Sequence, residues 1–297
     1  MKIGLVLEGG AMRGMYTSGV LDVFLDNDIK VDGIIGVSAG VLFGVNFLSR
    51  QRGRAIRYNK KYANEKNYMG FRSLIKTGNI INKEFAFDEV PRKLDVFDNE
   101  TYKKSDVDFY DTVTNVETGK PEYIKLDDVF EQMEVCRATS AMPFVSEIVE
   151  LDGKKYLDGG ISDSIPVDEC KRMGYDKIIV VLTRPIDYRK SAPKEWMAKI
   201  KYGKYPNLVN TINNRYLNYN KTVEKIIDME NKKEIFVIRP SRLVQLKRIE
   251  KDVNKLQEMY DLGVSDCERL IGEIKEYLSD WENYRFLGTL QCAPTVM

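Results

Sequence analysis

The sequence predicts an α/β fold with a largely parallel central sheet flanked by helices, and a helical C-terminal region. Two short apolar runs near the N-terminus, residues 2–7 and 31–37, each lead through glycine-containing residues into a stretch with helical spacing. A third apolar run, residues 178–182, is typical of a buried strand. Successive strand and helix units favour a parallel sheet. With 297 residues and 43% apolar residues, the chain can bury a large core.

The first 105 residues divide into two strand–helix units and a weaker segment. The expected elements are a strand over 2–7, a helix carrying Val20, Leu21, Phe24 and Leu25, a strand over 31–37 and a helix after Ser38. Residues 51–105 are charged and aromatic without a strand pattern. They predict a helical insertion or lid over the sheet.

In the remaining chain, predicted strands are mixed with a helix as far as residue 182, and the pattern is mainly helical after that. We expect strands over 107–116 and 123–126, a helix over 129–139, a hairpin over 146–157 that turns at Asp152-Gly153, and a strand over 178–182. After Pro185 the pattern is helical, apart from an apolar run at 235–238, and the helix over 253–278 is expected to break near Gly263. The predicted division is a catalytic domain over 1–183 and a mostly helical extension over 184–297, packed on the same core, with 188–206 as the candidate boundary.

Composition excludes several classes of function. Lys plus Arg total 46 against 45 for Asp plus Glu, so the net charge of +1 gives no general attraction to nucleic acid. The chain contains no histidine, which excludes a Ser-His-Asp triad, a Cys-His pair and histidine metal ligands. The four cysteines, Cys136, Cys170, Cys267 and Cys292, have no paired spacing, and we interpret them as buried thiols. No metal and no cofactor is predicted.

The apolar runs are too short for a signal peptide or a membrane span. Ile3 to Leu7 is interrupted by Glu8, and no run approaches the ~20 residues that a span needs. We therefore expect a soluble, cytoplasmic protein that meets any lipid from outside.

Gly36-Val37-Ser38-Ala39-Gly40 is a G-x-S-x-G motif between a predicted strand and a predicted helix. In that context the motif forms a nucleophile elbow, because glycines leave room for the sharp turn around the serine. The N-terminal amides of the following helix favour negative charge near Ser38. A simple turn of small residues is the alternative.

A second glycine-rich loop, Gly9-Gly10-Ala11-Met12-Arg13-Gly14, also follows a strand. Successive backbone amides in such a loop can bind a phosphate or the oxyanion of a tetrahedral intermediate. The loop lacks the Gly-Lys-Ser/Thr ending of a Walker A motif, and Ala11 stands where a dinucleotide fingerprint requires glycine.

The third element is Tyr156-Leu157-Asp158-Gly159-Gly160, in which an aspartate ends a strand. Alone it indicates a turn. Together the three elements resemble the patatin-like phospholipase family, which pairs G-x-S-x-G with a distant D-G-G or D-G-A aspartate. The segments 138–144, 165–167 and 174–178 resemble the family as well, so that the similarity covers about residues 1–183.

The resemblance implies a three-layer fold and a lipid acyl-ester hydrolase of the phospholipase A, lysophospholipase or esterase type. It implies Ser38 as nucleophile, Asp158 as its direct base, and an acyl-serine intermediate. The oxyanion would be held in the loop of Gly9, Gly10, Ala11, Arg13 and Gly14, chiefly by the amides of Gly10 and Ala11. Gly36 and Gly40 would shape the elbow, and Gly159 and Gly160 the turn after Asp158. Burial should raise the pKa of Asp158.

Two basic segments suggest a peripheral contact with a membrane. The first contains Arg50, Arg52, Arg54, Arg57, Lys60 and Lys61, and the second contains Lys190, Lys194, Lys199 and Lys201 around Trp196, Met197 and Tyr202. Solvated helix faces are the alternative.

Two other functions stay open at this point. One is a nucleotide- or phosphate-binding protein in which Asp28 or Asp32 reaches a ribose, and the other is a catalytically silent scaffold with the same fold. The expected partner is a lipid or acyl-ester substrate and not a nucleic acid. The oligomeric state is left open.

Overall fold

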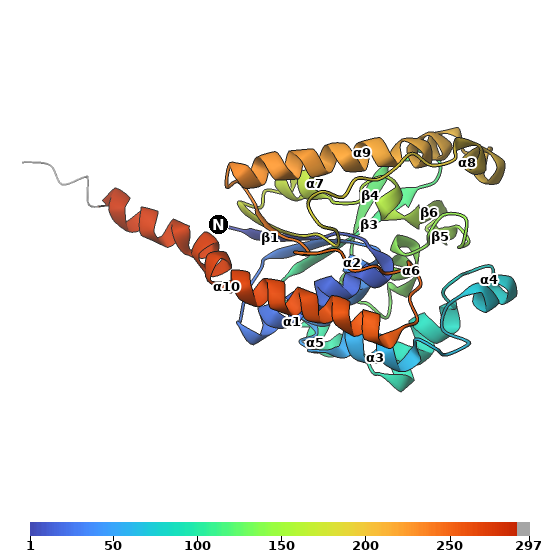
Figure 1. The fold of residues 1–297 in the computed structure, drawn as a ribbon, viewed down its shortest axis with the longest axis horizontal. Coiled ribbons are helices and arrows are strands. Elements are labelled where there is room, and N and C mark those ends of the chain that lie inside the picture. Colours follow the sequence, from blue (N-terminus) through green and yellow to red (C-terminus); the bar gives the residue numbers. More distant parts are fainter. Residues whose placement is uncertain (290–297) are drawn as a thin grey trace, which may run out of the picture.

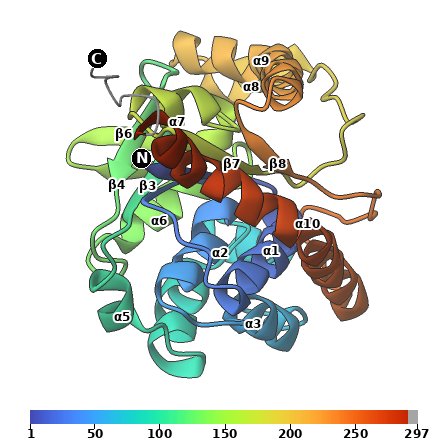
Figure 2. The ribbon, with the colours of Figure 1, turned by 90° about the vertical axis from the view of Figure 1, so that its left-hand side faces the viewer.

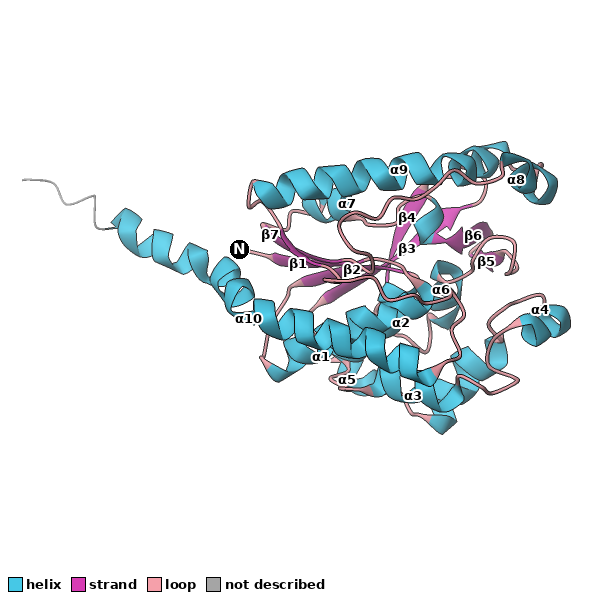
Figure 3. Ribbon diagram, viewed as in Figure 1, coloured by secondary structure: helices cyan, strands magenta, loops and turns pink. Residues whose placement is uncertain are grey.

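The computed structural model describes the backbone of residues 1–289 and the side chains of residues 1–279. A central sheet lies between two layers of helices (Figures 1 and 3). The strands are β1 (Ile3–Leu7), β2 (Gly33–Val37), β3 (Asp108–Asn115), β4 (Pro121–Lys125), β5 (Val149–Leu151), β6 (Lys154–Asp158), β7 (Lys177–Val181) and β8 (Phe236–Ile238). The sheet has the order β5-β6-β3-β2-β1-β7-β8, and β4 pairs with β3. The predicted α/β fold with a largely parallel sheet is confirmed.

The five strands β3, β2, β1, β7 and β8 run parallel, whereas β4, β5 and β6 add antiparallel pairs at one side. The chain passes from β1 to β2 on one side, and β7 later joins the other side of β1. The carboxyl end of β1 is therefore a topological switch point, where loops diverge and leave room for a ligand.

Alternation along the central strands produces two cores. Leu5 and Leu7 of β1 face one helical layer, and Val6 faces the other. The first layer contains α1 (Met15–Asp26), α2 (Ala39–Leu48) and α10 (Val253–Thr289), and the second contains α7 (Val167–Arg172) and α9 (Pro206–Asn231) (Figure 2). Both faces are apolar because helices cover both.

The predicted insertion is helical. It contains α3 (Arg54–Tyr62), α4 (Phe71–Thr77), a π-helix (Phe85–Leu94) and α5 (Asn99–Lys103). Two 3-10 turns, Ala11–Gly14 and Gly159–Ile161, follow β1 and β6, and the remaining helices are α6 (Met133–Thr139) and α8 (Glu195–Tyr202). The helix expected over 129–139 begins only at Met133, because Asp128 accepts hydrogen bonds from the amides of Phe130 and Glu131 and fixes a turn there.

The break expected near Gly263 is wrong, since α10 continues through it. Gly263 lies where α10 crosses α1, and a Cβ atom on it would come within 2.2 Å of the Tyr16 carbonyl oxygen. The apolar run at 235–238 forms β8, which extends the main sheet beside β7. The division of the chain at residue 183 stays a prediction.

Cys136, Cys170 and Cys267 are buried free thiols, and Cys292 lies outside the described residues. None of the helices in the described part of the chain combines the length and the apolar character that crossing a membrane requires.

Candidate active site

Ser38 occupies a sharp turn between β2 and α2. Its φ angle is +53°, a region that favours glycine, and non-glycine residues held there are frequently found at functional sites. The Ser38 amide donates to Thr139 Oγ1 at 2.9 Å, and that hydroxyl donates to the Thr112 carbonyl at 2.6 Å. A Cβ atom on Gly40 would lie 2.5 Å from the Leu7 carbonyl oxygen, so the turn requires glycine at this position.

Strand register brings Asp158 level with Ser38. Val37, at the end of β2, pairs with Thr112 of β3, and the next residue of β3, Val113, pairs with Asp158 of β6. Ser38 and Asp158 therefore flank β3 from opposite sides at the same height. Thr114 Oγ1 donates to the Asp158 carbonyl at 2.8 Å and holds the end of β6 in place.

The Asp158 side chain is buried, with 7% of its surface exposed. Burial raises the pKa of this carboxyl, while the positive charge of Arg215, the Ser38 hydroxyl and the Gly160 amide oppose the rise. The Gly160 amide donates to Asp158 Oδ1 at 2.7 Å. A carboxyl with a raised pKa beside a serine hydroxyl is a better proton acceptor than an ordinary aspartate.

The glycine-rich loop lies directly next to the elbow. Ala11 has a φ angle of +48°, and a Cβ atom on Gly9 would approach the Ser38 Cβ atom at 3.3 Å. The Met12 amide donates to the Arg248 carbonyl and the Arg13 amide to the Gly10 carbonyl. Within the described residues, the amides of Gly10 and Ala11 donate to no protein acceptor, and they can therefore bind an oxyanion.

The other glycines of the predicted site are packing positions. A Cβ atom on Gly14 would meet the Phe43 ring at 2.8 Å, one on Gly36 would meet Val41 Cγ2 at 2.8 Å, and one on Gly159 would meet the Thr112 carbonyl oxygen at 2.1 Å. These three glycines and Gly40 line neither cavity at Ser38, whereas Gly9, Gly10 and Gly160 do. The roles assigned to all of these residues stay predictions.

Two cavities meet at Ser38. The apolar cavity measures about 970 Å³, including the part open to solvent, and is lined by side chains of α2, the insertion and α6, among them Leu42, Val45, Tyr58, Ala86, Val90 and Met133. The second cavity, about 710 Å³ on the same measure, is lined mainly by polar and charged groups. Ala11, Ser38, Met142 and Arg248 line both.

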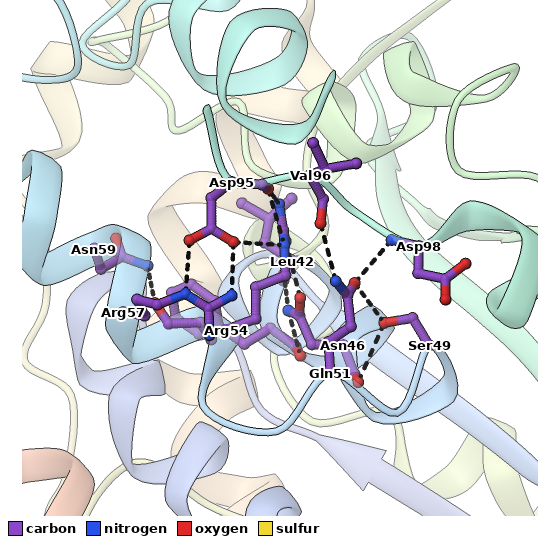
Figure 4. A network of polar contacts seen from close by, with 12 residues as sticks. Leu42, Asn46, Ser49, Gln51, Arg54, Arg57, Asn59, Asp95, Val96 and Asp98 are labelled. Carbon is purple, nitrogen blue, oxygen red and sulfur yellow. Dashed lines mark hydrogen bonds and ion pairs between the residues drawn. The ribbon is translucent and has the colours of Figure 1, made fainter. Parts of the chain in front are cut away.

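A buried polar network fixes the wall of the apolar cavity (Figure 4). Arg54 donates to Asn46 of α2 at 2.9 Å and forms an ion pair with Asp95 at 3.3 Å. Arg57 binds the same carboxylate, and Gln51 bonds to Val96 and Asp98. The network ties the two ends of the insertion to the helix that follows Ser38 (Figure 4).

Several residues at the site were missing from the sequence prediction. Glu8, at the end of β1, accepts hydrogen bonds from the amide and hydroxyl of Thr183 and from the Tyr219 hydroxyl. Its signal was a charged residue that directly ends an apolar run. Arg184, Tyr188, Arg215, Tyr219 and Arg248 line the second cavity from the C-terminal part of the chain.

The first basic segment and the nucleotide alternative lose support. Arg52 pairs with Asp26, and Arg54 and Arg57 pair with Asp95, so these three arginines serve internal contacts. Asp32 accepts from the Ile3 amide at the amino end of β1, the edge of the sheet opposite to the glycine-rich loop, and Asp28 pairs with Lys30. Neither aspartate can reach a ligand bound at that loop.

In the part of the chain that the structure describes, no three acidic or cysteine side chains cluster in a way that could hold a metal ion. The arrangement at Ser38 consists of a hydroxyl, a carboxyl, two free amides and a set of cations. It can bind an acyl group and transfer a proton.

Two family models match the chain. One, described as patatin-like phospholipase, matches residues 5–171. The other, described as a domain of unknown function (DUF6363), matches residues 205–279. The interval between the two matches, residues 172–204, runs from the end of α7 to the start of α9 and contains β7 and α8.

Known proteins with similar sequences include an uncharacterized protein and several lysophospholipases. The chain is 29% identical over 276 residues to the uncharacterized protein YjjU of Escherichia coli (strain K12), covering 88% of this chain and 75% of that protein. It is 28% identical over 190 residues to lysophospholipase nte1 of Aspergillus fumigatus, covering 62% of this chain but only 12% of that protein. Lysophospholipase NTE1 of Lodderomyces elongisporus is 25% identical over 304 residues, 96% of this chain and 20% of that protein.

Among solved structures, VipD from Legionella pneumophila aligns with a TM-score of 0.44 at 12% identity, covering 92% of this chain and 67% of that one.

Proposed function

Because the chain belongs to the patatin-like phospholipase family, a family of lipid hydrolases, we propose that it hydrolyses lipid acyl esters with Ser38 and Asp158 as a two-residue catalytic pair. The reaction is of the phospholipase A, lysophospholipase or esterase type. One observation carries the proposal: Ser38 lines an apolar cavity, beside a buried carboxyl with a raised pKa and two amides that donate to no acceptor among the described residues.

The acyl chain lies in the apolar cavity, with its carbonyl oxygen at the amides of Gly10 and Ala11. Ser38 Oγ attacks the carbonyl carbon and its proton passes to Asp158. When the tetrahedral intermediate collapses, the proton moves from Asp158 to the leaving alcohol and an acyl-serine remains. Water then attacks the acyl-serine, gives a proton to Asp158, and releases the fatty acid as Ser38 recovers its hydrogen.

The pH dependence follows from the raised pKa of Asp158. The base must be ionised, so activity falls as the pH drops through that raised pKa, at a higher pH than an aspartate with an ordinary pKa of ~3.9 would give. Since the chain has no histidine, the acid limb belongs to the carboxyl, and an imidazole-directed reagent leaves the activity unchanged.

The test is hydrolysis of a set of acyl esters and lysophospholipids by the wild type, Ser38→Ala, Asp158→Asn and Asp111→Asn. Asp111 is a matched control, because its carboxyl is fully buried on the neighbouring strand β3 and lines neither cavity. Loss of a base or nucleophile costs roughly 10²–10⁴-fold or more in rate. We expect that loss in the first two variants only. Equal losses in all three, or activity in Ser38→Ala, would disprove the pair.

We also propose that the protein contacts membranes peripherally through α4 and α8. The exposed apolar side chains are Phe71 and Ile75 on α4 and Trp196, Met197 and Ile200 on α8. Both helices lie at the same end of the molecule (Figure 1), and the segment 144–147 joins them: Phe144 packs on Tyr202 of α8, and Val145 accepts from the Ile80 amide just after α4. Lys194, Lys199 and Lys201 accompany α8.

Vesicle sedimentation tests this contact. Ile200→Ser and Phe71→Ser, whose apolar groups are 77% and 74% exposed, should weaken binding to vesicles with anionic lipid. Leu217→Ser on α9, which also replaces an exposed apolar residue, is the control and should bind like the wild type. Unchanged binding of the α4 and α8 variants would remove the proposal.

A further inference from the structure

The second cavity at Ser38 collects cations from separate parts of the chain. Five line it: Arg13, Arg184, Lys190, Arg215 and Arg248. Among the described side chains, none of these five takes part in an ion pair, in contrast to buried Arg54, which pairs with Asp95. In the described part of the chain, Lys190 Nζ donates only to the Ser164 hydroxyl, at 3.2 Å. The five cations outnumber the two carboxylates that line the same cavity, Glu8 and Asp158, so the cavity holds an excess of positive charge. We refer to it as the cationic cavity.

The two carboxylates in the cationic cavity are already engaged. Glu8 accepts from Thr183 at 2.6 and 3.0 Å and from the Tyr219 hydroxyl at 2.8 Å. Asp158 accepts from the Gly160 amide and faces the Ser38 hydroxyl. The Nε atoms of Arg13 and Arg215 are buried and, in the described part of the chain, have no hydrogen-bond partner. A buried donor without a partner is costly, and both arginine side chains line the cavity, where an anion can accept hydrogen bonds from their guanidinium groups.

The pKa values of Arg13 and Lys190 agree with an excess of positive charge in the cationic cavity. Burial and the neighbouring Arg184 lower the pKa of Arg13 to about 10, and burial and Arg215 lower the pKa of Lys190 well below its usual value. These shifts report crowded, partly desolvated positive charges. An anion placed among them would raise the pKa of both groups.

The aromatic rings of the cationic cavity already contact cations of the protein itself, where a quaternary ammonium group would have to bind. The cavity contains two tyrosines, Tyr188 and Tyr219. The Arg184 guanidinium lies 4.2 Å from the centre of the Tyr188 ring, and Lys190 Nζ lies 3.4 Å from the centre of the Tyr219 ring. Because each ring already contacts a cation and the cavity holds five cations, a positively charged choline head group is disfavoured there.

We propose that the cationic cavity binds the phosphate of an anionic acyl ester, with a terminal phosphate monoester as the preferred head group, while the acyl chain fills the apolar cavity. The proposal rests on the proposed function, since it places the ester carbonyl at Ser38. Arginines bind phosphate oxygens in a bidentate manner, and a phosphate monoester carries about −1.5 to −2 charges at neutral pH. Ser38, Ala11, Met142 and Arg248 line both cavities, so the two ends of one substrate molecule can be held at once.

The test compares three substrates with the same oleoyl chain: lysophosphatidate, lysophosphatidylcholine and the uncharged monoacylglycerol. The readout is the ratio of kcat/KM between substrates, which cancels changes in Ser38 or Asp158 that all three share. In the wild type, kcat/KM for lysophosphatidate should exceed kcat/KM for each of the other two substrates by about tenfold or more, as expected for charge-assisted hydrogen bonds. Arg184→Gln and Arg215→Gln should each reduce that preference several-fold. Arg189→Gln is the matched control, because Arg189 pairs with Glu224 outside the cavity.

Each outcome decides between the alternatives. A preference for the choline or uncharged lipid, or a preference for lysophosphatidate that Arg184→Gln and Arg215→Gln leave intact, overturns the proposal. Thermal stabilisation by inorganic phosphate without any preference for lysophosphatidate would assign the cavity to free phosphate instead and also overturns it. Hydrolysis of the monoacylglycerol shows separately that the catalytic pair works. If no ester is hydrolysed, the proposed function fails, and stabilisation of Ser38→Ala by lysophosphatidate over lysophosphatidylcholine still decides the anion site.

Discussion

The apolar cavity and the cationic cavity meet at Ser38, yet different parts of the chain build them. Helix α2, the insertion and α6 supply most of the lining of the apolar cavity, and these elements come from the first half of the chain, while Arg248 and Ile249 add to it from the C-terminal part. The cationic cavity combines the glycine-rich loop with Arg184, Lys190, Arg215 and Arg248, which follow the patatin-like segment matched at residues 5–171. The division suggests that the chemistry and the acyl site belong to one part of the chain, and the preference for the head group to the other.

The largest effect that separates the two cavities is expected from blocking the apolar one. Ala86 lines only that cavity, and Ala86→Trp would occupy the space of several methylene groups. Each methylene kept out of apolar surroundings costs about 0.8 kcal/mol, so excluding about four lowers kcat/KM by roughly 200-fold. Oleoyl esters should lose this factor while butyryl esters keep their rate. Equal losses of kcat/KM on oleoyl and butyryl esters would show that the acyl chain lies elsewhere. The same loss in the small control variant Ala86→Ser would show this too.

The wall of the apolar cavity depends on a buried ion pair. Arg54→Met leaves Asp95 and Asn46 without a buried partner, and we expect the free energy of unfolding to fall by about 3 kcal/mol. Arg57→Met removes an exposed partner of the same carboxylate and should cost at most about 1 kcal/mol. Urea unfolding measures both. A larger loss in Arg57→Met than in Arg54→Met contradicts this assignment.

Asp158 lines the cationic cavity, and the ionised form of its buried carboxyl, which the proposed reaction needs, lowers the stability of the folded protein. Because burial raises its pKa in the folded state, the stabilisation from the neutral carboxyl is complete below the unfolded pKa of ~3.9 and is lost as the pH rises through the folded pKa. Asp158→Asn should therefore melt at a higher temperature than the wild type at pH 7. The gain in free energy of unfolding should be smaller than the loss expected for Arg54→Met. The difference in melting temperature should vanish near pH 3. A variant that melts lower at pH 7 would refute the raised pKa.

The smallest effect concerns Ala11, which lines both cavities at a φ angle of +48°. Ala11→Gly relieves about 1–2 kcal/mol of strain and adds about 0.4–1 kcal/mol of unfolded-state entropy, so the net gain in unfolding free energy is about 0.5–1 kcal/mol. Thermal unfolding measures the gain. A clear decrease in stability would mean that the loop holds Ala11 without strain.

Much of the fold was predictable because its strands are short apolar runs followed by turn glycines. The parallel sheet and the hairpin before Asp158 follow from that pattern, and the helical insertion follows from the lack of a strand pattern over residues 51–105. Gly263 misled the prediction, since a glycine at a helix crossing and a glycine at a helix end look alike in one sequence. The structure brings Ser38 and Asp158 together through the register of β2, β3 and β6, which no single motif contains.

The cationic cavity was not predictable. Arg215 and Tyr219 lie four residues apart on α9, where a cation and an aromatic residue look like part of an ordinary amphipathic helix. Lys190 was grouped with Lys194, Lys199 and Lys201 as a membrane-facing segment, but it reaches into the cavity instead. Only the folded chain shows that cations from four segments converge beside Ser38.

The role of Ser38 can be tested directly by labelling with a fluorophosphonate probe and locating the adduct by mass spectrometry. A single adduct on the peptide containing Ser38 is expected in the wild type and in Asp111→Asn, slower labelling in Asp158→Asn, and none in Ser38→Ala. Absence of an adduct from the folded wild type, or an adduct on another serine that persists in Ser38→Ala, would contradict the catalytic pair.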